Sequence, residues 1–140
     1  MKFSLKGLIF LTLLGLFFSN SRLNAQKYHK TDLGVSKEYI LSKINKLRKK
    51  GCRCGRKKMK PAQPLTWDKT LEKSAHLHAK EMSDYNYFDH HSINGKDIGE
   101  RLDALGYKWH YVGENLAVGQ KTFDEAMKDW IKSTSHCEML

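Results

Sequence analysis

The 140-residue sequence has no internal repeat and no low-complexity tract, which excludes a repeat architecture. Its only long apolar run, at residues 8–18, is too short to span a bilayer comfortably, so we expect no stable transmembrane span. No cysteine directly follows that run, which excludes a lipoprotein acylation site there. These absences leave a protein that is organised around ordinary globular packing.

The N-terminal residues have the pattern of a secretory signal peptide. Lys2 and Lys6 form a basic start, residues 8–18 form the apolar centre, and Leu23-Asn24-Ala25 resembles a cleavage site. An uncleaved N-terminal anchor is the alternative. We predict a signal peptide at residues 1–25 and an exported protein, extracellular or periplasmic.

The remaining chain is long enough for one modest core. We predict a linker at residues 26–35 and a single domain at 36–140. The whole chain has 25 Lys and Arg against 15 Asp and Glu. The predicted signal peptide carries three of these bases and no acid, so the mature chain has a formal charge of +7.

Much of this excess lies at residues 48–60 (RKKGCRCGRKKMK), which contain eight Lys or Arg and no acid. The block has no aromatic residue that could stack on a nucleobase, so we expect no specific nucleic-acid binding. A solvated loop is one reading. Attachment to a polyanion such as an acidic polysaccharide or anionic lipid is the other.

Hydrophobic periodicity and capping residues predict four helices. On the second, the apolar stripe includes His78, which is therefore expected to pack against the core rather than bind a ligand. Residues 107–111 alternate aromatic and polar side chains, which predicts a half-buried strand. The first predicted helix begins at Ser36 and ends before Gly51, and the second runs from Thr66 to about Tyr85. The third runs from Asp97 to Gly106, and the fourth begins at a Thr122–Glu125 capping box and frays at residues 133–135.

The polar residues that could bind a metal or take part in catalysis lie at the ends of these elements. They include the pair His90 and His91, the carboxylate of Glu114, and His136. Two imidazoles and one carboxylate are typical ligands of an open zinc site, with a free position for water or substrate. The alternative is that these histidines are surface residues or form structural hydrogen bonds.

The chain has three cysteines, Cys52, Cys54 and Cys137. In an exported protein pairing is expected, and an odd number leaves one thiol or an intermolecular bridge. Metal binding by the C-x-C pair is an alternative with little support, because no second cysteine pair accompanies it.

Several motifs together resemble one family, the CAP domain (also called the SCP or pathogenesis-related protein 1 domain) in its bacterial secreted form. They occur in family order and at family-like spacing from about Ser36 onward. The matching motifs are Leu65-Thr66-Trp67-Asp68, residues 75–82 (AHLHAKEM), residues 88–95 with Arg101, Gly106-Tyr107, residues 113–117 (GENLA) with Gly119, and Trp130 with Ser133 and His136-Cys137.

The resemblance implies an α+β fold, an α-β-α sandwich with helices around a small antiparallel sheet. The family carries a cleft with two histidines and two glutamates, which map here to His90, Glu114 and His136, with Ser133 at the second glutamate position. His91 is the fallback for His90. Asn115 adjoins Glu114 in the cleft. A divalent cation, zinc first of all, would then be held by His90, Glu114 and His136.

The resemblance also favours a disulfide between Cys54 and Cys137, leaving Cys52 over. The family continues beyond the His-Cys motif with two further strands, whereas this sequence stops at Leu140. We therefore expect an incomplete sandwich in which the strand at residues 107–111 has an exposed edge.

The function expected from these features is that of a non-enzymatic, secreted module that binds a ligand or metal in its cleft. The ligand would be a small molecule, a lipid or an envelope component, and no catalytic residue is assigned. A metal-dependent hydrolase acting on peptide or cell-wall material is one alternative. A surface protein that binds polyanions through residues 48–60 is the other.

Overall fold

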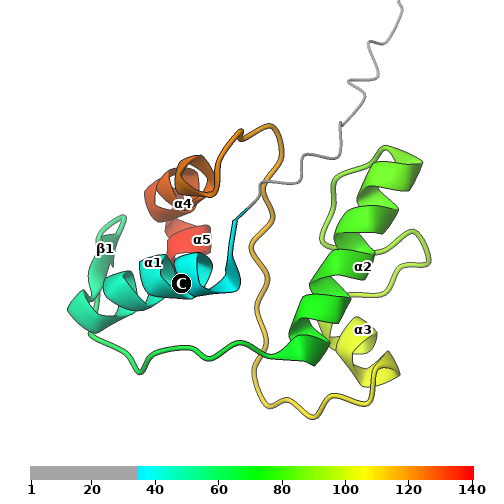
Figure 1. The fold of residues 1–140 in the computed structure, drawn as a ribbon, viewed down its shortest axis with the longest axis horizontal. Coiled ribbons are helices and arrows are strands. Elements are labelled where there is room, and N and C mark those ends of the chain that lie inside the picture. The colour runs from blue at the N-terminus through cyan, green and yellow to red at the C-terminus, as the bar shows by residue number, and fades with distance from the viewer. Residues whose placement is uncertain (1–34) are drawn as a thin grey trace, which may run out of the picture.

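The computed structural model describes residues 35–140, and the predicted signal peptide lies outside the described residues. This part of the chain forms five helices and one two-stranded antiparallel hairpin. Their arrangement is drawn in Figure 1. The predicted α+β class is confirmed. The helices are α1 (Lys37–Lys50), α2 (Lys69–Tyr85), α3 (Ile98–Ala104), α4 (Phe123–Lys132) and α5 (Thr134–Glu138), and the strands are β1 (Cys52–Cys54) and β2 (Lys57–Met59).

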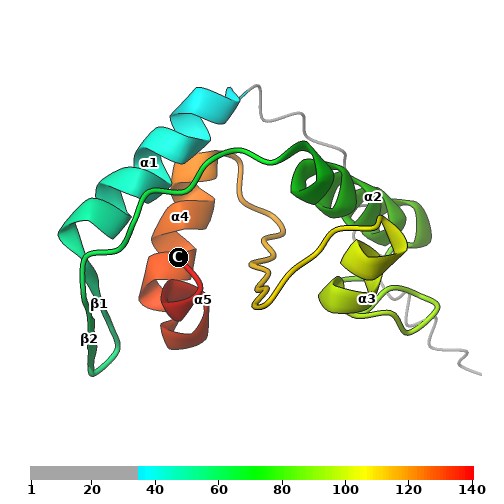
Figure 2. The same cartoon turned by 90° about the horizontal axis from the view of Figure 1, so that it is seen from below.

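The elements form two groups in space. In Figures 1 and 2, α2 and α3 lie together on one side, and α1, the hairpin, α4 and α5 lie on the other. Extended segments at residues 60–68 and 105–122 join the groups. The chain therefore crosses between the groups twice, and the second crossing carries Glu114 and Asn115.

Local capping explains where the helices begin. The Ser36 hydroxyl accepts from the Tyr39 N–H at 3.2 Å, and Asp97 starts α3, both as predicted. Asp97 also forms a capping box with Glu100, which was not predicted. The predicted start of α2 at Thr66 is wrong. The Asp68 carboxylate accepts from two N–H groups of the first turn, at 2.7 and 3.0 Å, so the helix begins after Asp68.

The last two helices differ from the prediction in detail. Thr122 caps α4 as predicted, but the Glu125 carboxylate accepts from the Lys121 N–H rather than from that of Thr122. The predicted fraying at residues 133–135 is also wrong. The chain turns at Ser133 and continues as the short helix α5, which carries His136 and Cys137.

The basic block forms a hairpin rather than a loop. Cys52 pairs with Met59 and Cys54 with Lys57, and neighbouring side chains alternate between the two faces. Cys54 is fully buried, whereas Arg53 between the two cysteines is exposed. A Cβ on Gly55, which has φ +58°, would lie 2.6 Å from the Thr134 hydroxyl, so the hairpin turn packs closely on α5.

The strand predicted at residues 107–111 is absent, because within residues 35–140 no other strand lies beside this segment to pair with it. Instead, Trp109 packs against Gly99 of α3 and its indole N–H donates to Asp103 at 3.1 Å. Tyr111 is 98% exposed. In this segment Trp109 packs on α3, and the aromatic residues do not form the buried face of a strand.

The buried core is small and divided between the groups. Met82 and Leu102 are buried on α2 and α3, and Phe123, Ala126 and Met127 are buried on α4. Among the described helices, none is both long and apolar enough to cross a membrane.

Candidate functional site

A carboxylate with two partners lies at the centre of the site. Glu114 Oε1 is 3.0 Å from Nδ1 of His90, and Glu114 Oε2 accepts from an Arg101 guanidinium N–H at 2.7 Å. Arg101 also donates to the backbone carbonyl of His90 at 2.7 Å. The side chains of Glu114 and Arg101 are 11% and 9% exposed, whereas that of His90 is 54% exposed. The imidazole Nδ1 of His90 therefore faces Glu114, which leaves its Nε2 as the free nitrogen.

The loop that carries His90 is fixed to α2 by a buried imidazole. His78 is 2% exposed, as predicted for a packed residue, and its Nε2 lies 2.9 Å from the carbonyl oxygen of Asp89. An N–H at Nε2 satisfies this carbonyl. The helical pattern predicted that His78 packs in the core, but not that His78 binds the carbonyl of Asp89, the residue before His90. The position of His78 on the side of α2 that faces the following loop could have indicated this contact.

A second contact next to His78 involves Glu81. The Tyr87 hydroxyl donates to Glu81 at 2.6 Å, and this bond holds the pKa of the carboxyl below its ordinary value. Burial, with a further contribution from the bond to Glu81, raises the pKa of Tyr87 to about 12. Glu81 is therefore a charged acceptor for the Tyr87 hydroxyl, and one of its oxygens lies 3.5 Å from Nδ1 of His78.

The segment after Glu114 contacts the other group of elements. The Asn115 amide donates to the carbonyl oxygen of His136 at 3.0 Å, and the Trp130 indole N–H donates to the carbonyl of Leu116 at 2.8 Å. The Nδ1 atom of His136 lies 2.8 Å from the Ser133 hydroxyl. Glu114 and Asn115 thus connect the histidine of one group to the histidine of the other.

The structure distinguishes between the two adjacent histidines. His91 instead contacts Asp89, with its Nδ1 3.1 Å from the carboxylate. The side chains of His91 and Asp89 are both largely exposed. The His91 backbone N–H, followed by its side chain, lowers the pKa of Asp89. His90, not His91, is the histidine that contacts Glu114.

The three proposed metal ligands are not gathered as one ligand set. In the described part of the chain, the one group of three His, Cys, Asp or Glu residues close enough to share an ion is Cys52, Cys54 and Cys137. Both oxygens of Glu114 are already engaged, and the Arg101 cation would repel a metal ion placed on them. Glu114 therefore fits the role of a group that orients His90 better than that of a direct ligand.

The cysteines pair as the resemblance implied. Cys54 and Cys137 form a disulfide across 83 residues of sequence, and Cys52 is free. The bond joins the hairpin to α5, next to His136.

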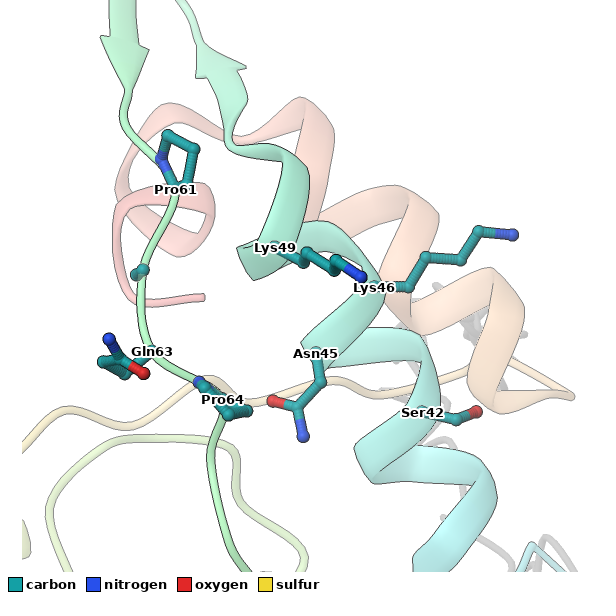
Figure 3. A pocket seen from close by; sticks show the side chains of 8 residues that line it. Ser42, Asn45, Lys46, Lys49, Pro61, Gln63 and Pro64 are labelled. Atoms are coloured by element: carbon teal, nitrogen blue, oxygen red, sulfur yellow. The ribbon is translucent and has the colours of Figure 1, made fainter.

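A surface hollow lies away from these residues. It has a volume of about 900 Å³ and lies between α1 and the extended segment that follows the hairpin. Figure 3 shows Asn45, Lys46 and Lys49 on the helix, with Pro61 and Pro64 on the segment opposite. None of the histidines or carboxylates discussed above lines it, so this hollow is distinct from the candidate site around Glu114.

The role of His78 predicts a measurable loss of stability. In His78→Leu the Asp89 carbonyl loses its buried donor, which should lower the free energy of unfolding by about 1 to 3 kcal/mol. His78→Gln retains a donor and should lose less. Urea unfolding of both variants checks this, and equal stability of His78→Leu and the native protein would contradict the proposed anchoring.

Comparison with known proteins gives two relatives, both from Bacillus subtilis (strain 168). The uncharacterized protein YkwD is 40% identical over 74 residues, which are 53% of this chain and 29% of that protein. The uncharacterized membrane protein YlbC is 29% identical over 76 residues, 54% of this chain and 22% of that protein. The matched region thus spans less than a third of either relative. No solved structure matches the chain significantly.

A family-wide comparison covers more of the chain. The sequence profile of the CAP, or cysteine-rich secretory protein, family matches residues 41–140, which include every candidate residue described above. The chain therefore belongs to the CAP (cysteine-rich secretory protein) family.

Proposed function

We propose that this chain is a non-enzymatic, secreted CAP module that binds a ligand through His90 and His136. Glu114, Arg101 and Asn115 hold these two histidines in place. The observation that carries the proposal is that both carboxylate oxygens of Glu114 are bonded, to His90 and to Arg101. A carboxylate that is engaged in this way is not available as a general base for hydrolysis.

The two imidazoles share a feature that favours ligand binding. Each uses Nδ1 in a hydrogen bond, His90 with Glu114 and His136 with Ser133, and within residues 35–140 neither Nε2 has a hydrogen-bond partner. The Glu114 carboxylate only accepts, so its bond fixes the His90 tautomer with the proton on Nδ1 and presents Nε2 to a metal ion or polar ligand. The Ser133 hydroxyl can donate or accept, so it orients the His136 ring without fixing its tautomer. A divalent cation would bind at the Nε2 of His90, with water completing its coordination, and His136 would join it only if the two groups of elements move closer together.

The Ser133–His136 pair does not by itself support a hydrolase. A serine nucleophile needs a histidine base that is oriented by a third group. Among the described side chains, the Nδ1 of His136 contacts Ser133 itself, so no carboxylate occupies the orienting position at that nitrogen.

Export is part of the proposal, and the disulfide supports it. Disulfides persist mainly in oxidising compartments, and Cys54–Cys137 is such a bond. The basic N-terminal residues and apolar run of the sequence favour the same route.

Zinc titration by calorimetry at neutral pH tests the site with the intact disulfide. We expect His90→Ala to abolish measurable binding. Glu114→Gln should weaken it by about 10-fold to 100-fold, as substitution of a group that orients a ligand does. His91→Ala is the matched control and should bind as the native protein does, because His91 faces Asp89.

Two outcomes would overturn the proposal. Equal zinc binding by the native protein, His90→Ala and Glu114→Gln would remove these residues as a binding site. Hydrolysis of a peptide or muropeptide panel that is lost in His90→Ala would replace the binding role with an enzymatic one.

A further inference from the structure

Three sulfur atoms meet where the hairpin packs on α5. The Sγ atom of Cys52 lies 3.6 Å from that of Cys54 and 3.7 Å from that of Cys137. Cys54 and Cys137 are buried, and Cys52 is half-buried at the edge of the cluster. The free thiol is thus equally close to both halves of the disulfide.

These separations match those of thiolates that share one metal ion. With a metal–sulfur distance of about 2.3 Å and tetrahedral angles, two bound sulfurs lie about 3.75 Å apart. Cys52 already stands at this distance from both other cysteines. Only the Cys54–Cys137 separation is shorter, because a covalent bond holds that pair, and reduction would release it.

We propose that the reduced chain binds one thiophilic cation, of the copper(I) or zinc class, through Cys52, Cys54 and Cys137. A dithiol supplies two electrons and two protons to the Cys54–Cys137 bond, which becomes two thiols, and the dithiol closes to its own disulfide. Each cysteine that then binds the cation releases its proton to solvent.

The surroundings of the cluster suit a soft cation. Met59 is the cross-strand partner of Cys52 and lies on the same face of the hairpin, so a thioether adjoins the thiols. Thiolate and thioether sulfurs together favour copper(I). Met59 and Cys52 also line a shallow hollow with Lys50, Arg53 and Lys58, so Cys52 lies at a basic part of the surface.

The site would be closed in the oxidised protein and open in the reduced one. The same two cysteines that form the disulfide supply two of the three ligands. The metal-binding state and the disulfide state therefore exclude each other. This site uses the cysteines as ligands and not the histidines assigned above, although Cys137 directly follows His136.

Titration with copper(I) against a colorimetric copper(I) chelator tests the proposal. The full chain is reduced with a dithiol, desalted without oxygen and compared with the oxidised chain. We expect the reduced protein to withhold one equivalent of copper(I) from the chelator and the oxidised protein to withhold none at the cysteines. Cys52→Ser should lower the affinity of the reduced protein at least tenfold.

Cys52→Ser is the decisive control because, after reduction, it keeps the Cys54 and Cys137 thiols and lacks only the third. Equal affinity of reduced native protein and reduced Cys52→Ser would overturn the proposal, whatever helix content the reduced chains retain. The absence of copper(I) retention by the reduced native protein would overturn it as well.

Discussion

Replacing Cys54 and Cys137 together with alanine is expected to lower the free energy of unfolding by about 4.6 kcal/mol. The bond closes a loop of 83 residues, and in the chain-entropy model a loop of that length restricts the unfolded chain by about this amount. Small domains have only about 5 to 15 kcal/mol of stability in total, so the double replacement should remove a large fraction of it. Urea unfolding followed by circular dichroism measures the loss.

Cys52→Ala is the matched control for the disulfide variant. It lies on the same strand as Cys54 and leaves the bond intact, so its unfolding midpoint should stay close to that of the native protein. The interpretation fails if Cys52→Ala destabilises the chain as much as the double replacement, because the free thiol would then contribute as much as the bond.

Glu114→Ala is the second change for which we expect a large effect. It should lower the free energy of unfolding by about 3 kcal/mol or more. It leaves the Arg101 guanidinium mostly buried without its carboxylate, and removing one member of a buried ion pair costs about 3 to 5 kcal/mol. Arg101 also binds the backbone carbonyl of His90, so its displacement would release that loop as well.

A double-mutant cycle with Arg101→Met isolates this pair. When both charges are absent no uncompensated charge remains, so the double variant should be more stable than the sum of the two single losses predicts. Losses that add without coupling would show that Glu114 and Arg101 do not stabilise each other, and the structural account of the site would be wrong.

The sequence predicted best those features that depend on neighbouring residues. Ser36 and Asp97 cap their helices as expected, because a cap is a bond between residues three apart. At Thr66 and Asp68 two capping residues lie close together, and only the geometry shows that the second is used. His78 was recognised as a packed residue by its place on a helical stripe.

Features that depend on distant partners were not accessible in the same way. The aromatic alternation at residues 107–111 predicted a strand, but a strand needs a hydrogen-bonded neighbour, which this segment lacks. The hairpin was missed because its charged residues read as a solvated loop. The Cys54–Cys137 pairing came from family resemblance, and the bond between Arg101 and Glu114 was not predicted.

Glu114 fixes the ring of His90 through Nδ1, and this orientation can be measured. Nitrogen-15 NMR of the imidazoles, at about two pH units above the ordinary histidine pKa of about 6.5, reads the tautomer directly. We predict that His90 carries its proton on Nδ1, facing Glu114, and that this preference is lost in Glu114→Ala. A His90 ring with its proton on Nε2 in the native protein, unchanged in Glu114→Ala, would contradict the account.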